Sequence, residues 1–230
     1  MPQTSITLSL YDLLGRVLPG ALVVWAGLVL ARDVLDINVL PGFPNDSLDT
    51  AIFSFVAFAV GFGTQAVARR VERLYINPVV QVGKARKRIF PSEQFMLPND
   101  KHFSQQFKDR FSATAAQRFG VPGNTSEAFN LAYSYLLISG YSQQMDVFNA
   151  LYGMARALIV STAITGVVYL ARAAFNLDDH EQVKESLFLA AALFLGTLVS
   201  FFQARNFSNR FADGVFRAFI AAEVRSTGAS

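Results

Sequence analysis

Four long runs without a charged residue constrain this chain more than any other feature. They cover residues 17–31, 50–68, 157–171 and 186–204. The two longer runs have 19 residues each, or about 28 Å of helix, close to the roughly 30 Å hydrocarbon core of a bilayer. The shorter runs have 15 residues each and lie between arginines, whose side chains can reach the membrane surface. We therefore expect four transmembrane helices.

Composition supports a membrane protein and excludes several kinds of chemistry. The chain is 52% hydrophobic and only 16% charged, against about 25% charged in a soluble domain. The alternative is a soluble helical protein, but 230 residues hardly suffice to enclose four such runs. The chain has no Cys and two His, which excludes disulfides and thiolate chemistry. We expect no metal, no cofactor and no enzymatic activity, because Asp100-Lys101-His102 is the only cluster resembling acid-base equipment and is typical of a surface.

The runs form a repeated pattern. Leu30-Ala31-Arg32 and Leu170-Ala171-Arg172 end the two short runs identically, and Gln65 and Gln203 lie near the ends of the two long ones. Two similar hairpins with the same orientation, related by an axis along the membrane normal, would give this pattern. The alternative is that the bilayer selects similar spans, and the sequence does not decide between them.

The distribution of basic residues predicts the orientation. Residues 69–118 hold 11 Lys and Arg, whereas residues 33–49 and 178–185 are acidic. Because cytoplasmic loops of membrane proteins are enriched in Lys and Arg, we expect both termini and the central insert in the cytoplasm, with the acidic loops outside.

We accordingly expect an all-α integral membrane protein of four parts. These are a first transmembrane hairpin (1–68), a cytoplasmic helical insert between spans 2 and 3 (69–153), a second hairpin (154–204) and a cytoplasmic amphipathic tail helix (205–230). Within the insert, apolar stripes predict helices at 103–119 and 126–139, and two prolines favour an irregular loop at 90–98. A third helix begins near Ser142 and continues into the third span.

Two groups of residues are candidate sites. The densest charge run is a candidate lipid- or anion-binding site, whose simplest ligands are lipid headgroups: Lys84, Arg86, Lys87 and Arg88. Nucleic acid is not expected, because no recognition motif accompanies the run. Polar residues within the spans are candidates for helix packing or for lining a pore: Gln65, Gln203, Ser161, Thr162 and Thr165.

Function stays open among three classes. The spans hold no Asp, Glu, Lys or His, which argues against an ion-coupled pump. The chain is a sensor or effector subunit, an oligomeric channel subunit, or a scaffold that docks a soluble partner enzyme. We expect a homo-oligomer in each case, with the lipid bilayer as its surroundings.

The segment from Tyr11 to Gly20, YDLLGRVLPG, resembles the N-terminal segment of uncharacterised bacterial four-span membrane proteins, some associated with antiphage defence. The resemblance covers about ten residues and carries over no functional residue. The resemblance favours the sensor or effector class and implies a location in the bacterial inner membrane.

Overall fold

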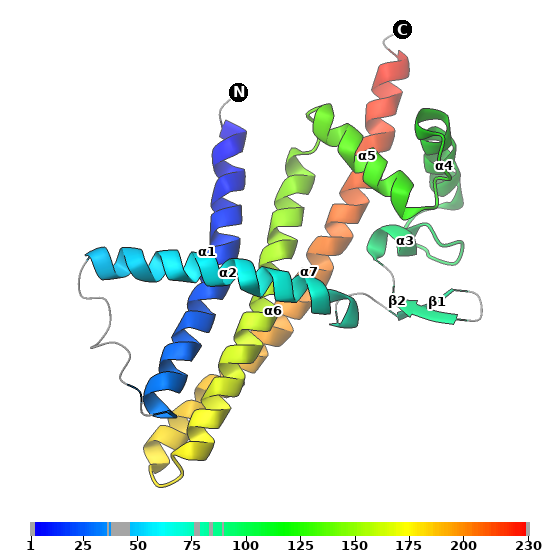
Figure 1. The fold of residues 1–230 in the computed structure, drawn as a ribbon. Helices are drawn as coiled ribbons and strands as arrows, with labels where there is room; N and C mark the ends of the chain where they lie inside the picture. Colours follow the sequence, from blue (N-terminus) through cyan, green and yellow to red (C-terminus); the bar gives the residue numbers. More distant parts are fainter. Residues whose placement is uncertain are drawn as a thin grey trace. The chain divides into compact units, whose positions relative to one another are not determined.

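The computed structural model describes residues 3–35, 37, 47–75, 79–82, 85–88 and 90–228. The four uncharged runs lie in four long helices (Figure 1): α1 (Gln3–Asp33), α2 (Ser47–Tyr75), α6 (Gln143–Phe175) and α7 (His180–Gly228). Each helix contains a segment long and apolar enough to cross a membrane. The four expected candidate spans are therefore confirmed. At 33 and 49 residues, α6 and α7 are about 50 and 74 Å long, so both exceed the hydrocarbon core.

The central part of the chain is also mainly helical, as expected for an all-α fold, with two local differences from the expected pattern. Short helix α3 (Pro91–Phe95) lies where an irregular loop was expected, because proline suits the first turn of a helix. Strands β1 (Val79–Val82) and β2 (Ala85–Arg88) form a short antiparallel pair that was not expected. Helices α4 (Gln105–Phe119) and α5 (Ser126–Ile138) match the two helices predicted from the apolar stripes.

Local capping explains where α4 and α5 begin and end. The side chains of Ser104 and Thr125 accept hydrogen bonds from the backbone N–H groups of Phe107 and Ala128, which satisfies donors that a helix start leaves unpaired. Gly120 ends α4 in the left-handed conformation (φ 71°), which glycine adopts without steric cost. These caps isolate α4 and α5 as separate short helices, whereas α6 and α7 continue without such a stop.

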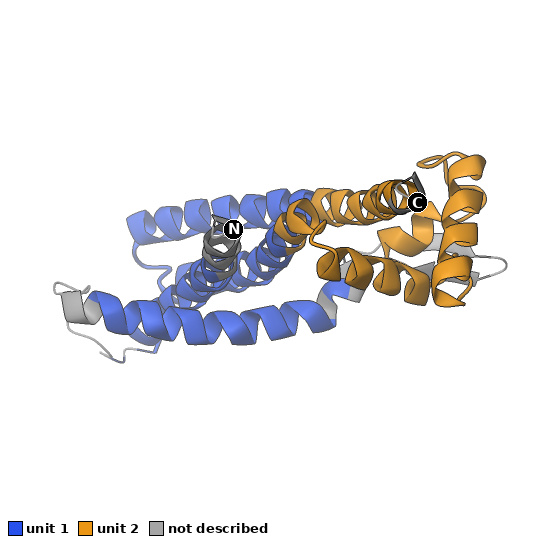
Figure 2. Ribbon diagram, turned by 90° about the horizontal axis from the view of Figure 1, so that it is seen from above, with its two compact units in different colours: residues 1–72, 150–204 blue, residues 73–149, 205–230 orange. Residues whose placement is uncertain are grey.

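The chain divides into two compact units, each built from two stretches of sequence (Figure 2). Unit 1 comprises residues 1–72 and 150–204, and unit 2 comprises residues 73–149 and 205–230. The expected insert and tail thus contribute to the same unit. Helix α6 contributes residues 143–149 to unit 2 and 150–175 to unit 1, and α7 is divided in the same way at residue 204.

Unit 2 has an aromatic core of the kind found in soluble proteins. Phe111, Phe216 and Phe219 are fully buried, and the rings of Phe111 and Phe216 meet edge to face at 4.7 Å. The core includes residues of α3, α4, α5, the start of α6 and the last third of α7. The apolar stripe predicted in the tail accordingly packs against the stripes of α4 and α5.

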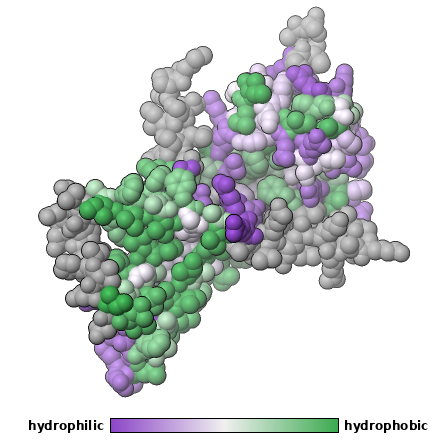
Figure 3. Space-filling model, in the orientation of Figure 1, coloured by the Kyte–Doolittle hydropathy of each residue, from purple (hydrophilic) through white to green (hydrophobic). Residues whose placement is uncertain are grey.

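Unit 1 has the opposite distribution. Large apolar side chains lie on its surface, including Phe55 at 73%, Phe188 at 73% and Phe202 at 66% exposure. Figure 3 shows the resulting apolar surface, in green, over the long helices of this unit. Such a surface requires an apolar environment such as lipid.

Within unit 1, the two helix pairs differ. Helices α6 and α7 lie side by side, and the ring of Phe194 fits against Gly166, where an added Cβ would approach Phe194 Cζ to 3.2 Å. Helix α2 instead crosses α1 steeply (Figures 1 and 2). The expected antiparallel hairpin of α1 and α2 is therefore not confirmed, and the two pairs are not alike in this structure.

Candidate functional site

Helix α6 is the element on which the polar contacts of unit 1 converge. Its uncharged run lies between Arg156 and Arg172, 16 residues or about 24 Å apart. The sequence suggested that these arginines extend to the membrane surface. In the structure both are largely buried against carboxylates of other helices, with side chains 11% and 16% exposed. Two ion-pair clusters therefore hold the two ends of this uncharged run of α6.

The first cluster, the Glu72 cluster, joins the C-terminal part of α2 to α6 and consists of Glu72, Tyr152 and Arg156. One carboxylate oxygen of Glu72 accepts a hydrogen bond from the Tyr152 hydroxyl at 2.6 Å. The other accepts one from Nη1 of Arg156. The Arg156 guanidinium also lies 5.2 Å from the centre of the Tyr152 ring. Removing one partner from such a pair leaves a buried charge uncompensated, at a cost of about 3–5 kcal/mol.

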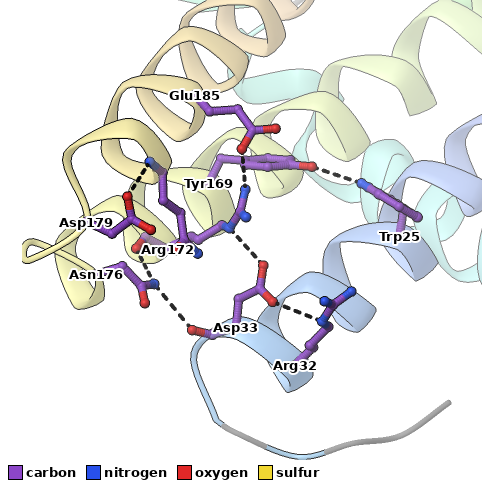
Figure 4. A network of polar contacts seen from close by, with 9 residues as sticks. Trp25, Arg32, Asp33, Tyr169, Arg172, Asn176, Asp179 and Glu185 are labelled. Carbon is purple, nitrogen blue, oxygen red and sulfur yellow. Dashed lines mark hydrogen bonds and ion pairs between the residues drawn. The ribbon is translucent and has the colours of Figure 1, made fainter. Parts of the chain in front are cut away.

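The second cluster, the Arg172 cluster, joins α1, α6 and α7 (Figure 4). Nε of Arg172 lies 2.8 Å from Oδ2 of Asp33, and Nη1 lies 3.6 Å from Oε2 of Glu185. The Asn176 side chain donates to the backbone carbonyl of Asp33 at 3.3 Å. Arg32, the residue before Asp33, is 83% exposed in its side chain and lies 3.5 Å from the same carboxylate.

One turn before Arg172, a further contact joins α6 to α1. Nε1 of Trp25 donates a hydrogen bond to the Tyr169 hydroxyl at 2.9 Å (Figure 4). Tyr169 is buried, at 7% exposure. Because the bond joins side chains of two different helices, it restricts the rotation of α6 relative to α1.

The hydroxyl residues proposed for helix packing or for a pore lie on α6, between the two clusters. Thr165 donates to the Leu22 carbonyl of α1 at 3.1 Å, and the Thr162 and Thr197 hydroxyls lie 2.8 Å apart between α6 and α7. Ser161 is fully buried and donates to the Leu158 carbonyl at 3.3 Å within its own helix. These hydroxyls therefore take part in contacts within one chain.

The two glutamines of the repeat have different surroundings. Nε2 of Gln65 donates to the Gly15 carbonyl of α1 at 3.0 Å, whereas Gln203 is exposed on α7. The equivalence suggested by their positions in the sequence is not matched by their contacts.

The basic run lies at the edge of the described part of the chain. Lys84 is outside the described residues, and for Arg86, Lys87 and Arg88 the structure gives the backbone, as strand β2. The proposal that this run binds lipid or another anion is therefore untested.

The crossing of α1 and α2 depends on glycine at two positions. A Cβ at Gly20 would lie 1.7 Å from the Ala57 carbonyl oxygen, and a Cβ at Gly61 would lie 2.0 Å from the Arg16 carbonyl oxygen. Neither position can accept a side chain without separating the helices. The Arg16 guanidinium lies 4.3 Å from the centre of the Phe62 ring, a cation–π contact between the same two helices.

In unit 2, His102 lies beside a carboxylate that the sequence did not connect with it. Nε2 of His102 lies 2.9 Å from Oδ1 of Asp213, and Nε of Arg217 donates to both oxygens of Asp213 at 2.9 Å. The imidazole stacks on the Phe95 ring at 3.9 Å. Lys101, the neighbour in sequence, is exposed. The arrangement ties the loop before α4 to α7, and its geometry suits a structural link.

A buried lysine stabilises the same loop. Lys108 is only 3% exposed, and its ammonium donates to the backbone carbonyls of Leu97 and Asp100 at 2.5 and 2.7 Å. These bonds satisfy carbonyls that follow α3, as a basic residue near a helix C-terminus commonly does. Among the described residues, no group of three or more His, Asp or Glu could hold a metal ion.

Sequence reasoning missed the partners of the two arginines and of His102. Each pair joins residues far apart in the chain, such as Glu72 with Arg156, and no local spacing indicates it. The available signal was that Arg156 and Arg172 both follow a tyrosine by three or four residues, which places both groups on one face of a helix.

A comparison of the chain with models of known protein families, with curated proteins and with solved structures found no match. The conclusions on function therefore depend on the residues and contacts described above.

Proposed function

We propose that this chain is a coupling subunit of the bacterial inner membrane, a sensor or effector in which unit 2 receives a signal in the cytoplasm and the helices of unit 1 respond. The observation that carries the proposal is that α6 and α7 each contribute to both units without a break in the helix. A change of tilt or rotation in the part of either helix in unit 2 would continue into its apolar part.

The contacts of α6 support this role. Because both ends of its uncharged run are held by buried ion pairs, a displacement of α6 would be passed to α1, α2 and α7. The hydroxyls of Thr162 and Thr165 are engaged within the chain, which favours coupling over an ion pore lined by these groups. The aromatic core of unit 2 supplies a stable body to which a partner or ligand would bind.

The proposal is tested with the full chain in lipid vesicles by hydrogen exchange. Phe216→Ala loosens the core of unit 2, and coupling predicts faster exchange of backbone amides in residues 157–171 as well as in unit 2. Phe188→Ala, at an exposed position of unit 1, is the matched control. Unchanged exchange in residues 157–171 with Phe216→Ala would contradict coupling.

Three further measurements test the membrane assignment and separate the other classes of function. Extraction from membranes by carbonate without detergent would contradict the membrane assignment. Ion flux through vesicles containing the chain would favour an oligomeric channel, and a soluble enzyme retained on the purified chain without any effect on α6 would favour a scaffold.

A further inference from the structure

We propose that α2 has two positions on α1: the crossed position seen here and an antiparallel hairpin, with the Glu72 cluster as the latch that holds the crossed one. This inference rests on the proposed function in one respect, that unit 1 spans a bilayer. It is based on a row of small residues along one face of α2, the seam, of which only part is buried in the crossed position.

The seam runs along one face of α2. Its members repeat with spacings of three and four residues, the pattern of a helix that packs closely along a neighbour: Thr50, Ser54, Ala57, Gly61, Thr64 and Ala68. The last four are buried, whereas Thr50 and Ser54 are exposed. The crossed position therefore buries four members of the seam and leaves the side chains of the other two exposed.

Helix α1 offers a matching surface. Gly20 is in backbone contact with Ala57, but a Cβ added at Gly27 would meet nothing within 4 Å. Gly27 follows Gly20 by seven residues, about two turns, so the two glycines share a face. If α2 ran antiparallel to α1 from the Gly20–Ala57 contact, Thr50 would lie opposite Gly27, because it precedes Ala57 by seven residues. The positions that are exposed in the crossed position would then cover each other.

The composition of α2 explains why a membrane would favour the antiparallel hairpin over the crossed position. The candidate span Thr50–Arg70 has 21 residues, about 31 Å of helix, which suits a crossing of the hydrocarbon core. A helix lying in the membrane surface has a charged or strongly polar face, and residues 50–68 have no charge. Rotation of α2 along α1 would place this segment across the bilayer.

The Glu72 cluster cannot persist when α2 rotates. Glu72 lies 11 residues beyond Gly61, about 16 Å along the helix, so rotation about the crossing displaces it by far more than the 2.6 Å bond to Tyr152 tolerates. Glu72 is also the last residue of this segment of unit 1, and Arg73 is the first of unit 2. A force transmitted along the chain from unit 2 therefore reaches the latch first.

Disulfide trapping tests the proposal directly, because the chain has no native cysteine. The pair Gly27→Cys and Thr50→Cys, in the full chain in lipid vesicles, forms a disulfide under a mild oxidant only in the hairpin. Adding Glu72→Gln should raise the yield of this disulfide at a fixed short time by at least about tenfold, because it removes the charge that pairs with Arg156. Glu185→Gln, which changes an α7 residue that contacts Arg172 at the far end of α6, is the matched control and should leave the yield unchanged.

A second pair shows whether the chain is folded in each sample. A Cβ at Gly15 lies 3.4 Å from Cβ of Met154, close to the separation in a disulfide, and this contact joins α1 to α6 independently of α2. The pair Gly15→Cys and Met154→Cys should cross-link with or without Glu72→Gln. If it does and the Gly27–Thr50 pair fails to respond to Glu72→Gln, the latch is wrong. Carbonate extraction of the same chain would instead contradict the membrane assignment.

Discussion

Phenylalanine has opposite surroundings in the two units. In unit 2, Phe111, Phe216 and Phe219 are fully buried, whereas in unit 1 Phe188 and Phe202 are 73% and 66% exposed. The same side chain is thus removed from the surface in one unit and presented on it in the other. Because burial of apolar area is the main favourable term in water, the core of unit 2 suits an aqueous environment, whereas the exposed rings of unit 1 suit an apolar one.

The largest expected effect concerns the replacement of a single phenylalanine ring in each unit. Phe216→Ala removes a ring that lies edge to face with Phe111 and with Phe103, and we expect it to lower the free energy of unfolding of unit 2 by about 3–5 kcal/mol. Phe188→Ala should change stability by no more than about 0.5 kcal/mol, as surface substitutions usually do. Urea unfolding of the full chain in detergent micelles, followed by near-ultraviolet circular dichroism, measures both.

Equal losses for the two variants would contradict the division. They would show that the Phe188 ring is covered by protein, as a close contact with a second copy of the chain would cover it. The comparison would then hold for the single chain only.

Within unit 1, the two Leu-Ala-Arg segments that end at Arg32 and Arg172 allow a second comparison of exposed and buried side chains. Arg172 is 16% exposed in its side chain and contacts Asp33 and Glu185, whereas Arg32 is 83% exposed. Arg172→Gln should therefore destabilise the helices of unit 1 by about 3 kcal/mol, because it leaves Asp33 without its main cation. Arg32→Gln should have little effect, and thermal unfolding in micelles compares the two directly. A similar loss for both would show that the segments are equivalent after all.

These segments also show which features of the fold could be predicted from the sequence and which could not. The uncharged runs predict the four long helices, and the Phe stripes predict α4 and α5, because periodicity and capping are local properties. The contacts of Arg172 with Asp33 and of Arg156 with Glu72 are not local, since they depend on which helices meet. The steep crossing of α1 and α2 likewise depends on Gly20 lying against Ala57 and Gly61 against Arg16, and glycine spacing indicates only that a close approach is possible.

The hydroxyl contacts of α6 should have smaller effects. Thr165→Val keeps the shape of the side chain and removes the bond to the Leu22 carbonyl, and we expect a loss of about 0.6 kcal/mol, the average for such contacts in a membrane protein. Thr114→Val, in which the lost bond is to a carbonyl of the same helix, is the control in unit 2. Ion flux that changes with Thr165→Val in vesicles would instead support a pore lined by this residue.

The smallest effect depends on pH and concerns Tyr133 in unit 2. Its hydroxyl donates to Oδ1 of Asp146 at 2.6 Å, and Ser142 donates to Oδ2 at 2.7 Å. Burial raises the pKa of Tyr133, and the hydrogen bond and negative charge of Asp146 raise it further. The folded state therefore favours the neutral phenol, and this stabilisation is complete below about pH 10, the ordinary pKa of tyrosine.

As the pH rises above that value, the unfolded chain loses the tyrosine proton while the folded one keeps it, so the stabilisation decreases. Tyr133→Phe should cost about 1 kcal/mol at pH 7 and should reduce the loss of stability between about pH 9 and 11. Tyr135→Phe, which keeps the ring that lies 4.4 Å from the Arg118 guanidinium, is the matched control. A pH dependence unchanged by Tyr133→Phe would show that Asp146 does not hold this proton. The difference between the two units would then depend on packing of the aromatic rings without a contribution from this buried polar contact.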